Sequence, residues 1–390
     1  MVKGELYTTF FDQLIQTNRP FAAWSAPGDS TPEIMIGDPE DILELKDFNQ
    51  LNGQEGFVFA PFRIEPDSPL MLLKPKIYLR DETAVANFNL NDLPAVQPNI
   101  KNHIDFHIIT EQDYLNDIAE TVRVIQKTKL SKVIVSRIVP QKRGHESIGK
   151  LYVRLRKQTP NAMVYLVNLP KAGLWMGATP EVLLQSKGKA LETVSLAGTQ
   201  SRRDDSDYSW QTKDIEEQAF VSRYMLDLFF KFKIHPYTTQ GPETLESGRV
   251  AHLKTSFTFA AKKVDAQLGN FIAELHPTPA VCGLPKSKAD RFISTIERHR
   301  RRYYTGYLGP WRMNECIRLF VNLRCMEITP ESYMLYTGGG ITGRSVPAEE
   351  WEETKKKATT LLSAINAVQK NDFNQETHPA AGFAASGERN

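Results

Sequence analysis

Residues 20–99 contain short apolar runs separated by clusters of proline, glycine and small polar residues, such as SAPGDSTP at positions 25–32. Runs of this length between turn-forming residues are typical of β-strands. Before them, Gly4 to Thr17 has the periodicity of a short amphipathic helix. The pattern therefore predicts one helix followed by a β-rich segment that is mostly antiparallel.

The periodicity changes after residue 110. Between positions 111 and 128 the apolar residues that recur at helical spacing are Leu115, Ile118, Val122 and Ile125. A strand-like run, SKVIVSR at positions 131–137, follows the predicted helix. Because side chains alternate along a strand, Lys132 shares a face with Ile134 and Ser136.

Three further strand-like runs are MVYLVNL (163–169), LWMGATPEVLLQS (174–186) and ALETVSLAG (190–198). The short links between them favour antiparallel meanders over βαβ units. A long helix is predicted next, from about Asp214 to Phe232. On this helix Glu217 lies in line with an apolar stripe, and a buried carboxylate is costly unless it is paired or binds a metal.

A last apolar-periodic helix is predicted from Ala348 to Val368. The following segment, residues 369–390, is polar and rich in small residues, and we expect it to be a disordered tail.

Composition and charge limit the kinds of molecule that the protein is expected to bind. The apolar content of 41% and charged content of 24% are ordinary for a globular protein, and the net charge of +2 offers no field to attract nucleic acid or a membrane surface. The three cysteines show no CxxC spacing, which argues against a disulfide framework or a zinc knuckle. No apolar run approaches the ~20 residues of a membrane span. We expect a cytoplasmic protein without nucleic-acid or membrane partners.

Several motifs follow one another in a fixed order. They are SKVIVSR, GATPE (177–181), LAGT (196–199), KDIEEQAF (213–220), HPTPAVCG (276–283), YYTGYLGPW (303–311), LFVNLRC (319–325), GGGITG (338–343) and EEWEET (349–354). Together they resemble the chorismate-utilising enzymes, and within them the isochorismate synthases. The resemblance is dense from about residue 111 to residue 362.

The resemblance implies an α+β fold in which large, largely antiparallel sheets pack together with helices on the outside. Residues 1–110 would form a β-rich N-terminal part of this fold, and residues 111–368 the chorismate-binding catalytic region. The implied reaction is the Mg²⁺-dependent isomerisation of chorismate to isochorismate. A monomer without a glutamine amidotransferase subunit is expected.

The resemblance also assigns the catalytic pair. Lys132 would be the general base that activates water for attack on C2 of chorismate, which requires burial or nearby positive charge to lower the pKa of the ammonium. Glu181 would be the general acid that protonates the departing C4 hydroxyl, so its carboxyl must stay protonated in an enclosed place. For either residue alone, a solvated surface side chain would be the simpler interpretation.

The remaining assignments concern metal and substrate. Glu217 and Glu353, with Glu350 beside Glu353 on one helix, resemble the family's Mg²⁺ ligands, which suits a cation that prefers a few carboxylates, water and substrate oxygens. This chain has Gln218 where a histidine commonly follows the ligand glutamate. The residues expected to contact substrate are Gly198, His252, Tyr304, Arg324 and Gly338. Of these, Arg324 would bind the pyruvyl carboxylate in a bidentate manner.

Other chorismate reactions remain alternatives. Enzymes that make aminodeoxychorismate carry a lysine at the position of Ala197, and anthranilate synthases have PAGT-like sequence where this chain has PTPA (277–280). Both differences favour water as the nucleophile. A salicylate synthase, which also eliminates pyruvate, and a non-catalytic chorismate-binding protein stay open, and so does the choice between a menaquinone and a siderophore pathway.

Two further patterns have simpler explanations. Gly338, Gly340 and Gly343 satisfy GxGxxG, but RSVP follows instead of a helix, which argues against a dinucleotide site. The basic run Arg298–Arg302 beside several tyrosines is interpreted as a local helix end rather than a nucleic-acid patch.

Overall fold

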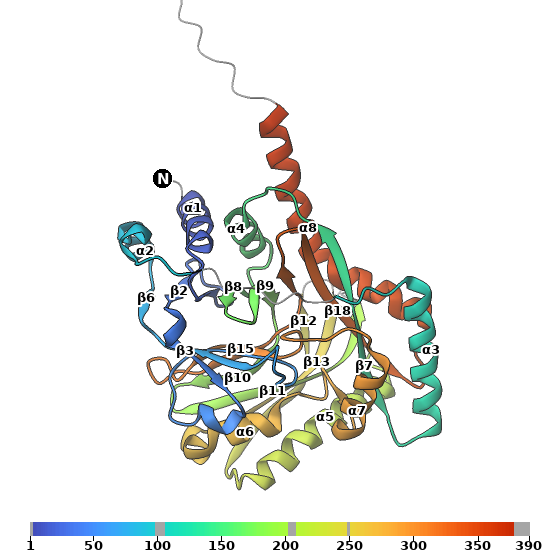
Figure 1. Ribbon diagram of the computed structural model, residues 1–390. Coiled ribbons are helices and arrows are strands. Elements are labelled where there is room, and N and C mark those ends of the chain that lie inside the picture. The colour runs from blue at the N-terminus through green and yellow to red at the C-terminus, as the bar shows by residue number, and fades with distance from the viewer. Residues whose placement is uncertain (1–2, 98–105, 202–207, 248–249, 378–390) are drawn as a thin grey trace, which may run out of the picture.

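The structure, a computed structural model, describes residues 3–97, 106–201, 208–247 and 250–377. Within these ranges the chain forms two nine-stranded sheets with helices on their outer faces, and the strands paired in each sheet run antiparallel (Figure 1). The α+β architecture expected from the sequence is confirmed.

The first sheet consists, in spatial order, of β14 (Gly283–Leu284), β7 (Lys132–Lys142), β18 (Ser332–Thr342), β17 (Cys325–Ile328), β9 (Gly173–Thr179), β8 (Met163–Leu169), β1 (Phe21–Ser25), β2 (Glu33–Ile36) and β6 (Ile77–Leu79). The second consists of β12 (Tyr237–Ser247), β13 (Val250–Ala260), β11 (Ala190–Ser201), β10 (Val182–Lys187), β16 (Arg318–Val321), β15 (Tyr307–Trp311), β4 (Gly56–Ala60), β5 (Leu70–Leu73) and β3 (Ile42–Leu45). Strands from the first 80 residues therefore extend both sheets.

The helices are α1 (Lys3–Gln16), α2 (Glu82–Asn87), α3 (Glu111–Lys127), α4 (Ile148–Gln158), α5 (Thr212–Lys231), α6 (Leu268–Leu275), α7 (Lys286–Ile296) and α8 (Pro347–Thr377). The predicted helices before β7 and after β11 are confirmed as α3 and α5. The last helix was predicted to end at Val368, but α8 runs to Thr377, and residues 378–390 of the expected tail lie outside the described residues. No helix in the described ranges is long and apolar enough to cross a membrane.

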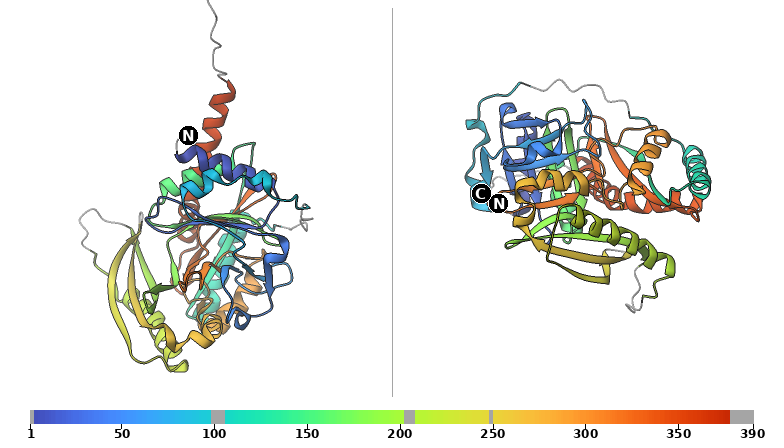
Figure 2. Two further views of the ribbon diagram at one scale, coloured as in Figure 1. Left: turned by 90° about the vertical axis from the view of Figure 1, so that its left-hand side faces the viewer. Right: turned by 90° about the horizontal axis from the view of Figure 1, so that it is seen from below.

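Successive side chains of a strand point to opposite faces of its sheet, and this alternation produces the layers of the fold. One face of β8 packs under α1, α4 and α8, while its opposite face, with Met163, Tyr165 and Val167, packs against the second sheet. The second sheet in turn is covered by α5 and α6. Figure 2 shows the resulting order, with the two sheets between two groups of helices. This arrangement leaves the space between the sheets as the place where side chains of both meet.

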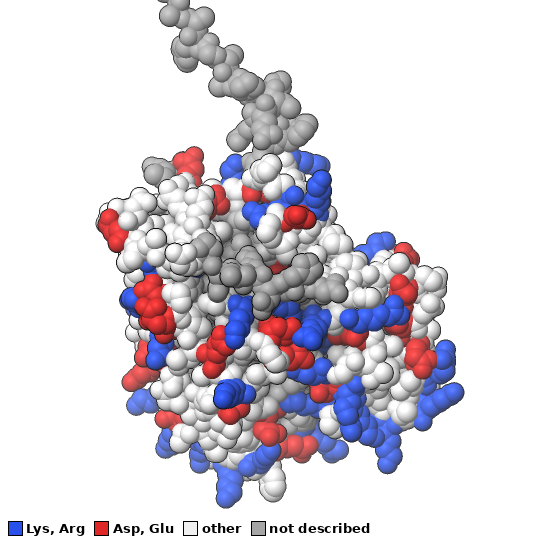
Figure 3. Space-filling view, in the orientation of Figure 1, with Lys and Arg blue, Asp and Glu red and all other residues white. Residues whose placement is uncertain are grey.

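The surface in the orientation of Figure 1 carries both signs of charge. Basic and acidic side chains are interspersed over most of this face in Figure 3. This face therefore carries charges of both signs, in keeping with the near balance of acidic and basic residues in the chain.

Two strand connections cross from one sheet to the other at the same place. The run LWMGATPEVLLQS, predicted as one strand-like segment, is two strands: β9 in the first sheet and β10 in the second, separated at Pro180 and Glu181. Between β16 and β17 the chain returns in the opposite direction through residues 322–324. Because Pro180 lacks an N–H donor, it interrupts the ladder of hydrogen bonds where the chain changes sheets.

The two crossings are joined by backbone hydrogen bonds. The Val321 N–H donates to the Glu181 carbonyl at 2.9 Å, and the Ala178 N–H donates to the Arg324 carbonyl at 3.1 Å. Arg324 has a φ of +48°, a left-handed conformation that is uncommon for a residue with a side chain. The crossings thus place Glu181 and Arg324 next to each other between the sheets.

Candidate active site

A cavity of about 350 Å³ opens where the two sheets meet. Its lining includes these residues predicted from the sequence: Lys132, Glu181, Gly198, Tyr304, Arg324, Gly338, Glu350 and Glu353. They come from β7, both sheet crossings, β11, the segment before β15, β18 and α8, which are far apart in the sequence. The structure therefore brings most of the expected site residues together around one enclosed space, of the size that ligand pockets commonly have.

Two of the expected residues are placed only by their backbone. Glu217 lies on α5, and His252 lies on β13 opposite Leu245 of β12, which lines the cavity. The side chains of Glu217 and His252 are outside the described part of the structure. Their expected roles stay predictions.

Lys132 begins β7 and lies over Gly340 of the neighbouring strand β18. A Cβ atom built on Gly340 would be 2.8 Å from Cε of Lys132 and 3.4 Å from its Nζ. Non-bonded carbon atoms do not approach this closely, so the lysine occupies the space that a side chain at position 340 would need. The glycine therefore lets the lysine lie flat along the cavity wall.

Glu181 lines the cavity and has a perturbed carboxyl. Burial raises the pKa of the Glu181 carboxyl to about 7, because an ionised carboxylate is poorly solvated there. The positive charges of Lys132, Lys357 and Arg324 oppose this increase in pKa. A carboxyl with such a pKa is a substantial fraction protonated at neutral pH, so it can donate a proton there.

Arg324 and Tyr304 form the wall beside Glu181. Burial lowers the pKa of the Arg324 guanidinium, and the charge of Glu181 opposes that shift. Tyr304 is 3% exposed and stacks on Tyr336, with ring centroids 5.5 Å apart. This end of the cavity thus offers a guanidinium and a phenol in a poorly hydrated environment, which suits a carboxylate of a bound ligand.

The first turns of α8 form the opposite end. A Cβ atom on Gly339 would be 2.9 Å from Oε2 of Glu350 and 3.7 Å from Oε1 of Glu353, so both carboxylates lie against this glycine. Lys357, one helical turn after Glu353, lies 2.7 Å from its Oε1 and donates to the Gly338 carbonyl at 2.8 Å. Lys357 is not part of any predicted motif, although its spacing of four residues from Glu353 is typical of an ion pair on a helix surface.

The carboxylates at this end of the cavity are the candidates for holding a metal ion. Among the described side chains, no group of three or more histidines, cysteines, aspartates or glutamates could hold a metal ion, and the side chain of Glu217 is outside that set. Two carboxylates nevertheless lie together beside Gly339, and both of these residues line the cavity. Carboxylate oxygens supplemented by water and substrate are the ligands that Mg²⁺ prefers. Glu350 and Glu353 therefore fit a magnesium site that a further ligand completes.

Gly198 lies where β11 is irregular. Its φ is +65°, and the pairing of β11 with β13 shifts between Ala197 and Gln200. A Cβ at this position would be 3.1 Å from Cβ of Asp214 and 3.2 Å from Cζ3 of Trp210, so the backbone is closely packed as well as left-handed. Glycine is favoured here for both reasons.

Gln218, the residue noted for its difference from the family pattern, holds α5 to the sheet. Its side chain is 3% exposed and donates to the hydroxyls of Ser195 and Thr255, each at 2.8 Å. These bonds connect α5 with β11 and β13. The helix that carries Glu217 is thus fixed by neutral hydrogen bonds.

His276 is structural, and the glycine-rich segment is not a dinucleotide site. The Nε2 of His276 lies 3.1 Å from the Pro61 carbonyl, and burial lowers the pKa of this imidazole to about 3, so the neutral ring donates there. Gly338 and Gly340 are strand residues of β18 that pair with β7, so the segment is not the tight turn of a dinucleotide site.

Two antiparallel sheets meet at a polar cavity lined by a lysine, a glutamate whose carboxyl pKa is raised by burial, and an arginine, which is the arrangement of a candidate enzyme active site. The sequence model of the family described as "Chorismate binding enzyme" matches residues 50–366, and the chain belongs to this family.

Relatives of known function agree with this family. The chain is 27% identical over 270 residues to the vibriobactin-specific isochorismate synthase of Vibrio cholerae, covering 67% of this chain and 68% of that protein. It is 26% identical over 274 residues to the isochorismate synthase EntC of Escherichia coli, covering 68% and 70%. The solved structure of MenF, the menaquinone-specific isochorismate synthase of Escherichia coli, has the same fold, with a TM-score of 0.70, 21% identity and coverage of 89% and 88%.

Proposed function

We propose that the protein is a Mg²⁺-dependent isochorismate synthase. The observation that carries the proposal is the enclosed Glu181, whose pKa is about 7, in the same cavity as Lys132. Exchange of a hydroxyl between two ring positions needs a base for the incoming water and an acid for the departing hydroxyl, and this cavity contains a candidate for each. The names of the relatives, which are isochorismate synthases, support the same reaction.

In the proposed reaction, Nζ of Lys132 takes a proton from water as the water oxygen bonds to C2 of chorismate. The two ring double bonds shift, the C4–O bond breaks, and Glu181 gives its proton to the leaving hydroxyl. One water enters and one leaves, so the overall change is an isomerisation. No covalent bond to the enzyme is needed.

Binding would be divided between the two ends of the cavity. Arg324 and Tyr304 would hold the pyruvyl carboxylate, because a guanidinium fork matches two carboxylate oxygens. Glu350 and Glu353, with Glu217, would hold Mg²⁺. When bound, the cation would neutralise the ring carboxylate and fix its position.

The test incubates the purified protein with chorismate and Mg²⁺, with and without a chelator, and separates isochorismate, salicylate and pyruvate by chromatography. Isochorismate without pyruvate, dependent on Mg²⁺ and lost in Lys132→Ala, is the expected result. Lys142→Ala, at the exposed far end of the same strand, is the matched control and should retain activity. Pyruvate with salicylate would assign the protein to the salicylate synthases, and no turnover would contradict catalysis.

A further inference from the structure

One edge of the strand that carries Lys132 is completed by side chains. β7 pairs with β18 along its whole length, but on its other edge β14 contributes only two residues, opposite Lys132 and Val133. The last backbone bond on that edge runs from the Ile134 N–H to the Cys282 carbonyl at 3.0 Å. Beyond it, the polar backbone groups of β7 need other partners.

Glu297 and Arg301 supply those partners. Arg301 donates from one terminal nitrogen to the Ile134 carbonyl at 2.8 Å, and Glu297 accepts from both the N–H and the hydroxyl of Ser136 at 2.8 Å each. The two side chains are each 3% exposed and are joined by two hydrogen bonds of 2.8 and 2.6 Å. The ion pair therefore continues the edge of β7 where the short strand β14 stops.

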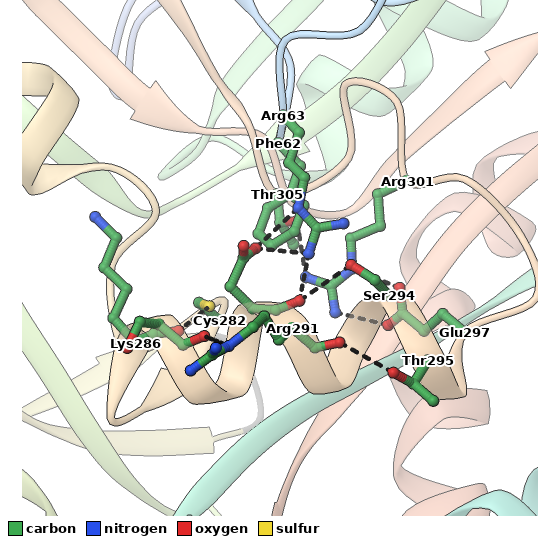
Figure 4. A network of polar contacts seen from close by, with 12 residues as sticks. Phe62, Arg63, Cys282, Lys286, Arg291, Ser294, Thr295, Glu297, Arg301 and Thr305 are labelled. Carbon is green, nitrogen blue, oxygen red and sulfur yellow. Dashed lines mark hydrogen bonds and ion pairs between the residues drawn. The ribbon is translucent and has the colours of Figure 1, made fainter.

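The same guanidinium also reaches the cavity wall. Its other terminal nitrogen donates to the Val281 carbonyl at 2.8 Å and to the Thr305 hydroxyl at 3.2 Å. Ile134, Val281 and Thr305 all line the cavity that contains Lys132. Figure 4 shows Arg301 between Glu297, at the end of α7, and Thr305. One side chain thus connects three separate parts of the wall.

An anion-binding role for this arginine-rich region is less favoured. A second cavity, of about 250 Å³, borders the ion pair and is lined by Arg63, Arg298 and Arg300 among others. Each of these arginines is already paired with carboxylates, namely Asp290, Asp113 with Asp117, and Asp67. An incoming anion would have to displace an existing partner in each case.

We propose that Glu297 and Arg301 form a positioning pair for the reaction. The pair fixes β7 against the Val281 and Thr305 walls, and so keeps Lys132 at the correct distance from a substrate held on the opposite side. A shift of about 1 Å in such a group can lower turnover about a hundredfold. This inference rests on the proposed isochorismate synthase activity for its kinetic part.

The neighbouring residue provides a matched control. Arg302 forms an equally buried ion pair with Glu327, with side-chain exposures of 2% and 4%. Its guanidinium donates to the carbonyls of Lys171 and Ala172, which are not among the residues that line the cavity. Replacing Arg302 therefore removes a comparable buried pair without altering the bonds to β7.

The experiment compares Arg301→Lys with Arg302→Lys by steady-state kinetics with chorismate, thermal unfolding and amide hydrogen exchange. Lysine keeps the charge but cannot donate to Glu297, Ile134, Val281 and Thr305 at once. In Arg301→Lys we expect kcat to fall about tenfold to a hundredfold, with KM within about threefold, and residues 132–138 to exchange faster. In Arg302→Lys we expect a similar loss of Tm, with kcat within about twofold and unchanged exchange of that segment.

If Arg301→Lys does not fold, Glu297→Gln is the milder variant, because the amide oxygen of the glutamine can still accept hydrogen bonds from Ser136. For this variant we expect kcat and hydrogen exchange to change in the same direction as in Arg301→Lys. Unchanged exchange of residues 132–138 in the folded variant would overturn the inference, and so would equal kcat losses in both arginine variants. If the parent protein makes no isochorismate, the proposed function fails, while the exchange comparison still decides whether the pair holds β7.

Discussion

Glu181 and Glu353 line the same cavity, but their surroundings differ. Glu181 lies at the crossing from β9 to β10 and is partly accessible, and burial raises the pKa of its carboxyl to about 7. Glu353 is on the first turns of α8, 44% exposed, and forms an ion pair with Lys357. One end of the cavity therefore favours a carboxyl that carries a proton, and the other favours a carboxylate that binds positive charge.

The difference shows how one residue type can serve two purposes in one site. The enclosed end is formed by strands of both sheets, whose backbone groups are already hydrogen-bonded, so little remains to solvate a charge. The open end is formed by a helix surface that water reaches. The proposed roles follow this difference, with proton transfer at the first end and cation binding at the second, and four predictions test that division.

The largest effect is expected from Glu181→Gln. Glutamine keeps the shape of the side chain but cannot donate a proton to the leaving hydroxyl, and such acids contribute about 10²- to 10⁴-fold to rate. We expect kcat to fall about a thousandfold with KM for chorismate within a few-fold, measured by isochorismate formation. Glu331→Gln, an exposed residue before β18, is the control. Retained turnover in Glu181→Gln would remove this residue from the acid role.

The next effect is expected from Gly340→Ala. The added methyl group would overlap Cε of Lys132, and because that atom is near the end of a flexible side chain, the lysine should move while the fold persists. We expect kcat to fall about a hundredfold, with Tm within a few degrees of the parent. Gly343→Ala is the matched control, since its methyl group would make ordinary contacts at 3.5 Å. A large loss of Tm would contradict a specific effect on the lysine.

The third prediction concerns stability and pH. The folded pKa of Glu181, about 7, is above the ordinary value of 4.5, so between these pH values the folded state holds a proton that the unfolded state has released. The free energy of unfolding should therefore fall as pH rises from about 4.5 to 7. Glu181→Gln lacks this ionisation and should be about 3 kcal/mol more stable than the parent at pH 8, with the difference lost at pH 4.

Chemical denaturation of both proteins at pH 4 and pH 8 measures this difference. The same substitution is thus expected to abolish turnover and to stabilise the fold, which is the trade-off expected when a carboxyl is buried for its chemistry. Equal stability of the two proteins at pH 8 would show that the carboxyl is solvated, and would weaken the contrast between the two ends.

Local sequence patterns predicted much of the fold. The helices α3 and α5 and the strands β7 and β8 follow from apolar periodicity, because each buries one face against a neighbour. The change of sheet at Pro180 was not predicted, because both halves of that run are apolar and strand-like, and the partner strands β17 and β16 lie more than a hundred residues away. Tertiary pairing, which no local window contains, decides where the run divides.

The site shows the same limit. The motifs supplied the residues around the cavity, but the pairing of Arg301 with Glu297 and the edge of β7 depends on how α7 packs against the first sheet. The run Arg298–Arg302 looks uniform in the sequence, yet Arg301 and Arg302 point to different carboxylates and different strands. Only the fold distinguishes the arginine that contacts the cavity wall from its neighbour.

The segment EEWEET makes this point testable, because two adjacent glutamates on α8 face different surroundings. Glu353 lies against Gly339 in the cavity, whereas Glu352 is 54% exposed and pairs with Lys355. If the open end binds Mg²⁺, Glu353→Gln should raise the Mg²⁺ concentration needed for half-maximal activity about tenfold, since a carboxamide is a weaker ligand than a carboxylate. Titration of Mg²⁺ at saturating chorismate measures this value.

Glu352→Gln is the matched control, and it should leave the Mg²⁺ requirement within about twofold of the parent, because an exposed helix-surface pair contributes little. Equal shifts in both variants would indicate a general effect of charge near the site, and would contradict cation binding by the particular face that α8 turns to Gly339.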